Sequence, residues 1–382
     1  MSSASLPISP ASGTASGASS HLGGRAPRQT GLLIGAGLAT LVVVVLVPFA
    51  NLGLPASHPL HITDYWISLA GKFLCYAMVA LAMGLVWGQA GILSLGHGLY
   101  FALGGYAMGM YLMRSIGRDG VYQSDLPDFM VFLDWKELPW HWTFSEHFLW
   151  AALLAMLIPG LLAFVFATFA FRSRIKGVYF SIITQALTYA AMLLFFRNET
   201  GFGGNNGFTD FKRILGFDIT ASGTRVALFA ITGVTLVAMT LVCAAIKRSK
   251  AGRVLAAIRD AEARVMFCGY DPLWYKVGIW TFSAVLCGIA GALYVPQVGI
   301  INPSEMSPAN SIEIAIWAAV GGRGYLTGPI VGAFLVNGAK SWFTVAMPEA
   351  WLYFLGALFV FVTLLLPQGV VGLLARLRRG RP

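Results

Sequence analysis

"GRVLAAIRDAEARVMFCGYDP", residues 252–272, interrupts an otherwise apolar chain. It holds six charged residues in 21 positions, whereas only 11% of the 382 residues of the whole chain are charged. Apolar segments of 22 residues each, 225–246 and 274–295, lie on either side of it. Each flank is long enough to cross a membrane as a helix, because about 20 residues suffice. The stretch therefore indicates a connection between two membrane-spanning helices.

Apolar segments of this kind recur along the chain. The chain is 57% hydrophobic, and its share of charged residues is well below the roughly one quarter typical of soluble domains. We predict an all-α polytopic membrane protein of about ten transmembrane helices, including short or broken segments. The predicted segments are 31–50, 66–87, 92–113, 149–171, 177–196, 225–246, 274–295, 309–321, 326–346 and 351–367.

Lys and Arg residues predict the orientation, because they concentrate in cytoplasmic loops. With all ten segments crossing and a cytoplasmic N-terminus, 16 basic residues lie inside and 6 outside. The outside pieces include two long loops, 114–148 and 197–224. This bias predicts that both termini are cytoplasmic. A disordered tail (1–30) and a basic tail (368–382) then flank a membrane domain over 31–367.

One predicted segment, 309–321, is too short to span comfortably alone. Nine crossings would put the basic tail outside, so this segment is expected to reach inward and turn at "GGRGYLTGP" (321–329). Irregular backbone at membrane depth must be covered by protein or water, so we expect the turn to be buried. A second Gly-rich break, "WGQAGILSLGHG" (87–98), lies in the first half. Broken segments in both halves point to an inverted repeat around a central pathway, although the residues themselves show no repeat.

The charged stretch has the pattern of a short amphipathic helix over 252–268. Its apolar residues fall on one helix face, its charged residues lie largely off that face, and Gly269 provides a stop. Such a helix could lie on lipid headgroups or dock a cytoplasmic protein. Its mixed charges favour docking, since lipid-binding helices are usually more basic.

No motif for an enzyme or a metal site is present. The chain lacks a Walker pattern, and its four cysteines form no CxxC or Cys/His cluster. His97 has no partner at ligand spacing, which favours a hydrogen-bonded histidine inside the bundle. We therefore expect a chain that carries out no catalysis and binds no metal.

Three stretches resemble the permeases of branched-chain-amino-acid-type ABC importers. "LAAIRDAEARVMFCGYDPLWYKVGIWTFSAVLCGIAGALY" (255–294) is similar to the cytoplasmic loop and next helix of that family. "GQAGILSLGHGLYFALGGYA" (88–107) and "GGRGYLTGPIVGAF" (321–334) match two more of its hallmarks in the expected order. The resemblance covers roughly residues 60–370. Within it, "LPDFMVFLDWKELPW" (126–140) and "TGFGGNNGFTDFK" (200–212) resemble the C subunit of the urea-type importers.

The resemblance implies a bacterial inner-membrane complex. Its partners would be a second, homologous permease, two cytoplasmic ABC ATPases and an extracytoplasmic substrate-binding protein. ATP would be used by the ATPases and no cofactor bound by this chain, and no nucleic acid is involved. The family's loop helix docks on the ATPase, which assigns that role to Ile258, Arg259, Asp260, Glu262, Arg264 and Gly269.

The resemblance also implies urea as the cargo. Urea is neutral and rich in hydrogen-bonding groups, so its path needs amide, hydroxyl and carbonyl groups more than fixed charge. Polar residues within or beside the predicted spans are candidates for the path, although they equally suit helix packing. These candidates are Gln89, Ser94, His97, Gln185 and Asn337, with a candidate outer gate at Gly203, Gly204, Asn205, Asn206 and Gly207.

Three further questions stay open at the level of sequence. Lys72 and Glu313 are expected either to reach toward the outer face or to line the path. The same machinery could import branched-chain amino acids or short amides. A more remote alternative is an ATP-independent channel or an ion-coupled transporter, which would need no charged docking helix.

Overall fold

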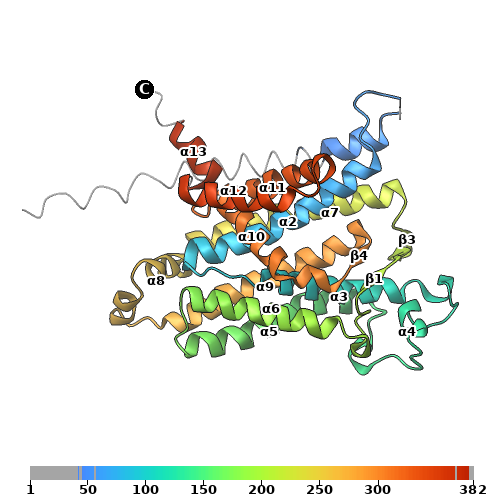
Figure 1. Ribbon diagram of the computed structural model, residues 1–382, viewed down its shortest axis with the longest axis horizontal. Coiled ribbons are helices and arrows are strands. Elements are labelled where there is room, and N and C mark those ends of the chain that lie inside the picture. The colour runs from blue at the N-terminus through green and yellow to red at the C-terminus, as the bar shows by residue number, and fades with distance from the viewer. Residues whose placement is uncertain (1–41, 43–44, 56, 366–367, 378–382) are drawn as a thin grey trace, which may run out of the picture.

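The computed structural model describes residues 42, 45–55, 57–365 and 368–377. The predicted tail 1–30, most of the segment 31–50 and residues 378–382 lie outside this range. Within it the chain is almost entirely helical and contains only four two-residue strands, which confirms the all-α prediction. Figure 1 shows the long helices running side by side as a bundle.

Nine helices cover the predicted segments from 66 onward. They are α2 (Asp64–Leu85), α3 (His97–Arg114), α5 (Phe148–Arg172), α6 (Val178–Phe195), α7 (Ser222–Arg248), α9 (Pro272–Val298), α10 (Pro308–Gly321), α11 (Gly328–Ala346) and α12 (Trp351–Leu365). Among the described residues, five helical stretches are long and apolar enough to cross a membrane. These five are 64–90, 148–172, 178–195, 222–248 and 272–298.

Shorter elements connect the long helices. The helical ones are η1 (Val86–Ala90), η2 (Gly117–Asp119), α4 (Asp128–Phe132), η3 (Trp140–Trp142), η4 (Asn198–Thr200), α8 (Lys250–Phe267), η5 (Pro303–Met306) and α13 (Gly369–Leu377). The strands are β1 (Phe208–Thr209), β2 (Arg213–Ile214), β3 (Phe217–Asp218) and β4 (Ile300–Ile301). β1 pairs antiparallel with β4, and β2 pairs antiparallel with β3.

Glycines bring α3, α5 and α9 into close contact at the centre of the bundle. A Cβ added to Gly104 of α3 would lie 2.0 Å from the carbonyl oxygen of Gly288 in α9. A Cβ on Gly288 would in turn lie 2.1 Å from the carbonyl oxygen of Ala155 in α5. Small residues allow backbones to approach in this way, and van der Waals packing then holds membrane helices together.

The backbone between α9 and α10 turns back into the bundle. After β4, the side chain of Ile301 lies against Gly105 in the middle of α3, and the carbonyl oxygen of Glu305 lies beside Gly98 in its first turn. The chain thus descends along α3, and α10 begins deep in the bundle. Its 14 residues span about 21 Å, which carries them from that depth to the end of the bundle where α8 lies.

The expectation of a buried turn at 321–329 holds except at its tip. Gly321, Gly322 and residues 326–329 are buried, whereas Arg323 and Gly324 are exposed. Irregular backbone also lies within the bundle, at 303–307 and at 92–96. The turn emerges because α10 starts partway along the bundle and so reaches its end.

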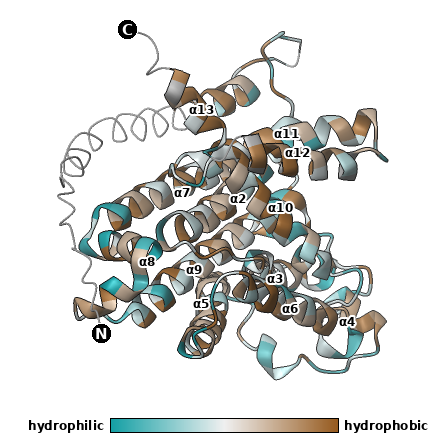
Figure 2. Cartoon of the chain, turned by 60° about the vertical axis from the view of Figure 1, so that its left-hand side comes forward, coloured by the Kyte–Doolittle hydropathy of each residue, from teal (hydrophilic) through white to brown (hydrophobic). Residues whose placement is uncertain are grey.

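The predicted inside and outside pieces lie at opposite ends of the bundle. We call the end formed by 87–91, 247–271 and 321–325 the inner end, and the end formed by 114–148, 197–224 and 299–302 the outer end. Figure 1 shows α8 at one extreme and α4 with the strands at the other. Figure 2 shows hydrophilic residues on α8 and on the loops around α4, with hydrophobic residues dominating the helices between them.

Candidate functional site

A break in the first long helix lies at the inner end. α2 continues as the π-helix η1, and Gly91 then takes a left-handed conformation (φ 71°) before the chain runs unwound to Gly96. Side chains of α6 satisfy the freed backbone groups. Thr184 Oγ1 accepts a hydrogen bond from the Leu95 N–H at 3.1 Å, and Ser181 Oγ donates to the Leu93 carbonyl at 2.8 Å. Single-turn π-helices inside membrane helices often mark functional positions.

The charged stretch forms α8, which packs on this break. Ser249 begins the helix by accepting a hydrogen bond from the Gly252 N–H at 3.2 Å. Val254, Ile258 and Val265 are buried on the predicted apolar face. The helix is kinked at Ala261 (φ −158°, ψ 74°), which the periodicity did not predict.

Arg259 joins α8 directly to the broken helix. Its Nη1 donates to the carbonyl oxygen of Gly88 at 2.5 Å, and its Nε donates to Asp260 at 2.8 Å. The absence of a side chain at Gly91 makes room for it, because a Cβ there would lie 2.7 Å from Arg259 Cγ. On the other side of the break, the Arg323 guanidinium lies 5.0 Å from the centre of the Trp87 ring. The break is therefore held between α8 and the α10–α11 turn.

Glu262 ties α8 to two further elements. One carboxylate oxygen lies 2.8 Å from Lys176 in the α5–α6 connection, and the other lies 2.7 Å from Lys276 in α9. Burial raises the pKa of Glu262, but the hydrogen bonds from the two lysines outweigh it, so the pKa lies below its ordinary value. Glu262 is thus an internal clamp of this subunit.

The predicted coupling residues therefore divide into two groups. Ile258, Arg259 and Glu262 contact the rest of the chain, whereas Asp260, Arg264 and Gly269 are exposed. The sequence reasoning missed two exposed apolar residues at the end of α8. Phe267 is 92% exposed and Met266 is 51% exposed. Both residues lie off the predicted apolar face of the helix, and this position could have indicated that they are exposed.

The predicted pathway residues lie on η1, on the unwound segment after it, and on α3, α6 and α11. His97 is buried, with Nε2 2.8 Å from Ser283 Oγ, which donates to the Ala82 carbonyl, so it is a hydrogen-bonded histidine of the bundle. Asn337 donates to the Ala333 carbonyl one turn back in its own helix. Ser94 accepts from the Gly96 N–H. Gln89 and Gln185 are half-buried on η1 and α6.

The candidate gate residues form a tight turn at the outer end. Gly203, Gly204 and Gly207 are buried and have positive φ angles, whereas Asn205 and Asn206 are exposed at the tip. A Cβ on Gly207 would lie 2.1 Å from the carbonyl oxygen of Ile301. These glycines therefore allow β1 to pair with β4.

The two long outer loops pack together as one aromatic layer. Trp142 of the first loop donates its indole N–H to the carbonyl oxygen of Gly201 in the second at 2.9 Å. The rings of Phe129 and Phe208 lie 5.1 Å apart across the same contact. The segments 126–140 and 200–212 are thus parts of a single structural unit.

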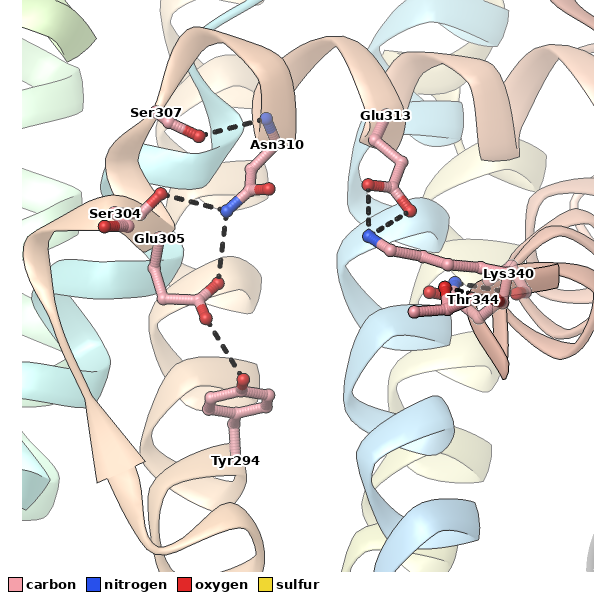
Figure 3. A network of polar contacts seen from close by, with 10 residues as sticks. Tyr294, Ser304, Glu305, Ser307, Asn310, Glu313, Lys340 and Thr344 are labelled. Atoms are coloured by element: carbon pink, nitrogen blue, oxygen red, sulfur yellow. Dashed lines mark hydrogen bonds and ion pairs between the residues drawn. The ribbon is translucent and has the colours of Figure 1, made fainter. Parts of the chain in front are cut away.

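A cleft opens between α2, α3, η5, α10 and α11. Its lining is Tyr76, Val79, Gly98, Phe101, Glu305, Asn310, Glu313, Ile314, Trp317 and Lys340. Figure 3 shows the polar side chains of this region in two groups.

The first polar group centres on Glu305. Tyr294 donates its hydroxyl to Glu305 Oε1 at 3.1 Å, and Asn310 Nδ2 lies 3.5 Å from Oε2. Asn310 Nδ2 also donates to the Ser304 carbonyl at 3.0 Å. These contacts hold the carboxylate on the re-entrant segment, which begins after β4.

The second group is an ion pair between neighbouring helices. Lys340 Nζ of α11 lies 2.7 Å and 3.0 Å from the two carboxylate oxygens of Glu313 in α10. Glu313 is 6% exposed, so it pairs inside the protein and does not reach toward the outer face. Lys72 lies 5.6 Å from the centre of the Tyr76 ring. The sequence missed the pair because its partners are 27 positions apart.

Within the described residues, no group of three or more His, Cys, Asp and Glu side chains is placed to hold a metal ion.

Comparison with known proteins shows which family this chain matches. Residues 65–363 match the family described as "Branched-chain amino acid transport system / permease component". The high-affinity branched-chain amino acid transport system permease protein LivM of Escherichia coli is 24% identical over 344 residues, which cover 84% of this chain and 73% of that protein. LivM of Salmonella typhimurium is 22% identical over 356 residues, covering 87% and 74%. No solved structure gives a significant match.

Proposed function

The chain belongs to the permease components of branched-chain amino acid transport systems, and from this membership we propose that it is the membrane subunit of an ATP-driven importer of urea. The family makes it a multi-pass subunit of an ABC transporter and not an enzyme. The alternative of a passive channel or an ion-coupled transporter is set aside by the same membership.

The contact between Arg259 and Gly88 carries the proposal for how ATP energy enters this subunit. α8 touches the broken helix through this hydrogen bond and is clamped by Glu262 to the α5–α6 connection and to α9. A displacement of α8 would therefore be passed to three elements at once. A conformational change of this kind needs an element with two discrete arrangements, and the π-helical break is suited to that role.

The docking surface that we propose for the ATPase is the exposed end of α8. Arg264, Met266 and Phe267 project there without covering the bundle. An exposed aromatic beside a charged residue is the composition found at the energetic centres of interfaces. The remaining partners proposed for the complex are a second homologous permease, two ATPases in all and an extracytoplasmic binding protein.

A pull-down from the assembled complex tests this docking surface. Phe267→Asp should reduce recovery of the ATPase subunits at least tenfold, because a buried aromatic contact would be replaced by a charge. Phe217→Asp is the matched control, since Phe217 is 68% exposed at the outer end and should leave recovery unchanged. Equal recovery with both variants would overturn the docking surface.

Urea as the cargo is supported by the outer loops. The two segments that resemble the urea-type importers, 126–140 and 200–212, pack against each other, as the contacts of Trp142 and Phe208 describe. In the cleft, the two charges of Glu313 and Lys340 offset each other, and Glu305 remains as a hydrogen-bond acceptor for the N–H groups of a neutral cargo. Branched-chain amino acids are the second candidate, because both LivM relatives carry that description and a zwitterion is also neutral overall.

Uptake measurements separate the two cargoes. Cells that lack this chain, with and without a plasmid that restores it, are supplied with labelled urea or labelled leucine at micromolar concentration. We expect the plasmid to restore saturable, ATP-dependent urea uptake and to leave leucine uptake unchanged. Restoration of leucine uptake alone would transfer the assignment to amino acids.

A further inference from the structure

We propose that the cleft lined by Trp317 and Glu305 is a recognition point for the cargo, in which the Trp317 indole N–H binds a carbonyl oxygen and the Glu305 carboxylate binds N–H groups. The proposal rests on the proposed function and concerns residues that the sequence did not single out.

An unsatisfied donor is the first observation that supports it. Trp317 lines the cleft and is 4% exposed. Its indole Nε1 has no hydrogen-bond partner among the described residues. A buried polar group without a partner is costly, so such groups are rare unless something else fills the role. Less than 1 Å² of the Nε1 atom is accessible in this conformation, so the ring has to turn toward the cleft for a bound acceptor oxygen to satisfy it.

An acceptor with free capacity lines the same cleft. Glu305 accepts hydrogen bonds from Tyr294 and Asn310. A carboxylate has about four lone-pair positions, so capacity remains for donors from a ligand. Glu313, by contrast, has both oxygens on Lys340. The cleft therefore offers one free donor and one partly free acceptor.

Aromatic rings shape the space between these groups. The rings of Tyr76 and Trp317 lie 4.9 Å apart, and those of Tyr76 and Tyr294 lie 5.7 Å apart. Such walls exclude water and strengthen the hydrogen bonds made inside them.

These features together describe the ligand. It is small, has a carbonyl oxygen as acceptor and has N–H groups as donors, and it needs no net charge. Urea and simple amides have this pattern of groups. A purely aliphatic side chain would leave both the Trp317 donor and the Glu305 acceptor without a partner.

Replacement of the carbonyl by a thiocarbonyl tests the Trp317 assignment. In the complete complex, with the same binding protein throughout, we compare uptake of labelled urea and thiourea at subsaturating concentration by the wild type and by Trp317→Phe. Sulfur is a weak acceptor, so the variant should lower urea uptake about 5- to 10-fold and thiourea uptake less than about twofold. The ratio of urea to thiourea uptake should therefore fall.

Two further variants complete the test. Trp342→Phe removes an indole that is 63% exposed on α11 and should leave the ratio as in the wild type. Glu305→Gln keeps the shape of the side chain and removes its charge. It should lower uptake of both compounds to a similar extent, because both present N–H groups.

The outcomes distinguish this proposal from the proposed function. Urea uptake by the wild type with an unchanged ratio in Trp317→Phe overturns the cleft assignment and leaves the urea importer intact. Unchanged uptake of both compounds by Glu305→Gln overturns the role of Glu305. Absence of urea uptake by the wild-type complex overturns the cargo assignment, and the cleft proposal with it.

Discussion

The inner and outer ends of this bundle are held together by different kinds of contact. At the inner end, the side chains of Arg259 and Glu262 reach across to a backbone carbonyl and to two lysines. At the outer end, the indole of Trp142 and the turn at Gly207 bring backbones and rings into direct contact. Charged contacts on long side chains can be exchanged, whereas a turn packed to the limit of its atoms cannot. We therefore expect the outer end to be rigid and the inner end to rearrange.

The largest effect is expected for Gly207→Ala at the outer end. The new Cβ would lie 2.1 Å from the Ile301 carbonyl oxygen, at a residue with a φ of 65°. Left-handed backbone costs about 1 kcal/mol for a residue with a Cβ, and the clash adds several more. The free energy of unfolding, measured by SDS titration in detergent, should fall by about 4 kcal/mol. Gly216→Ala is the control, since its φ is 84° but no heavy atom lies within 4 Å of the added carbon. An equal loss for both variants would mean that the close approach contributes nothing.

Trp142→Phe should have the second-largest effect. The variant removes the hydrogen bond to Gly201. It also leaves a small cavity, because phenylalanine is smaller than tryptophan and the Trp142 side chain is only 4% exposed. A lost hydrogen bond of about 1 kcal/mol and the cavity together predict a loss of about 2.5 kcal/mol. The same measurement on Trp140→Phe, whose side chain is 87% exposed, should show almost no change. A rigid outer end is disproved if the two variants behave alike.

Glu262→Gln probes the clamp at the inner end. It leaves Lys276, whose side chain is 10% exposed, without its counter-charge. Breaking a buried pair costs 3–5 kcal/mol, and because Glu262 is only partly buried we expect about 2 kcal/mol in the SDS titration. Asp260→Asn removes an exposed charge on the same helix and is expected to leave the free energy of unfolding unchanged. A loss with Glu262→Gln that exceeds that of Trp142→Phe would reverse the contrast between the ends.

Arg259→Met removes the bond from α8 to the break. The free energy of unfolding of this variant should fall by only about 1.5 kcal/mol, because the Arg259 side chain is partly exposed. The expected functional effect is larger, with ATP hydrolysis retained and urea uptake per ATP reduced at least fivefold. Arg253→Met, at an exposed position of α8, serves as the control. Normal coupling in Arg259→Met would remove the break from the transmission path.

Asp125→Asn should have the smallest effect of all. Asp125 pairs with Arg118 at 3.0 Å in the first outer loop, but both side chains are about three-quarters exposed. Exposed pairs of this kind contribute little to stability, so the thermal midpoint should not change measurably. A shift as large as that of Glu262→Gln would show that surface charge also holds the outer end.

Much of the fold could be predicted because it depends on local composition. Helix positions follow from apolar length, and the sorting of loops to two ends follows from Lys and Arg. The helix at 250–267 follows from its spacing of apolar residues and its stop at Gly269. The kink at Ala261 could not be predicted, since alanine favours a regular helix.

The candidate site depends more on the tertiary structure. His97 and Asn337 make hydrogen bonds within the bundle, and their assignment to the pathway stays a prediction. A short inward segment was expected over 309–321, but Glu305 and Trp317 were missed because nothing in the sequence indicates that they line one cleft.

By itself, the sequence determined that this chain is an all-α membrane permease with a charged helix at one end. Length, hydropathy and charge act locally and can be read along the chain. Only the tertiary structure decided which charges pair within the chain and which stay exposed. Arg259 finds Gly88 across 171 positions, and Lys340 finds Glu313 across 27. Such pairings depend on how the helices pack in three dimensions. Local sequence patterns cannot predict them, because the paired residues are far apart along the chain.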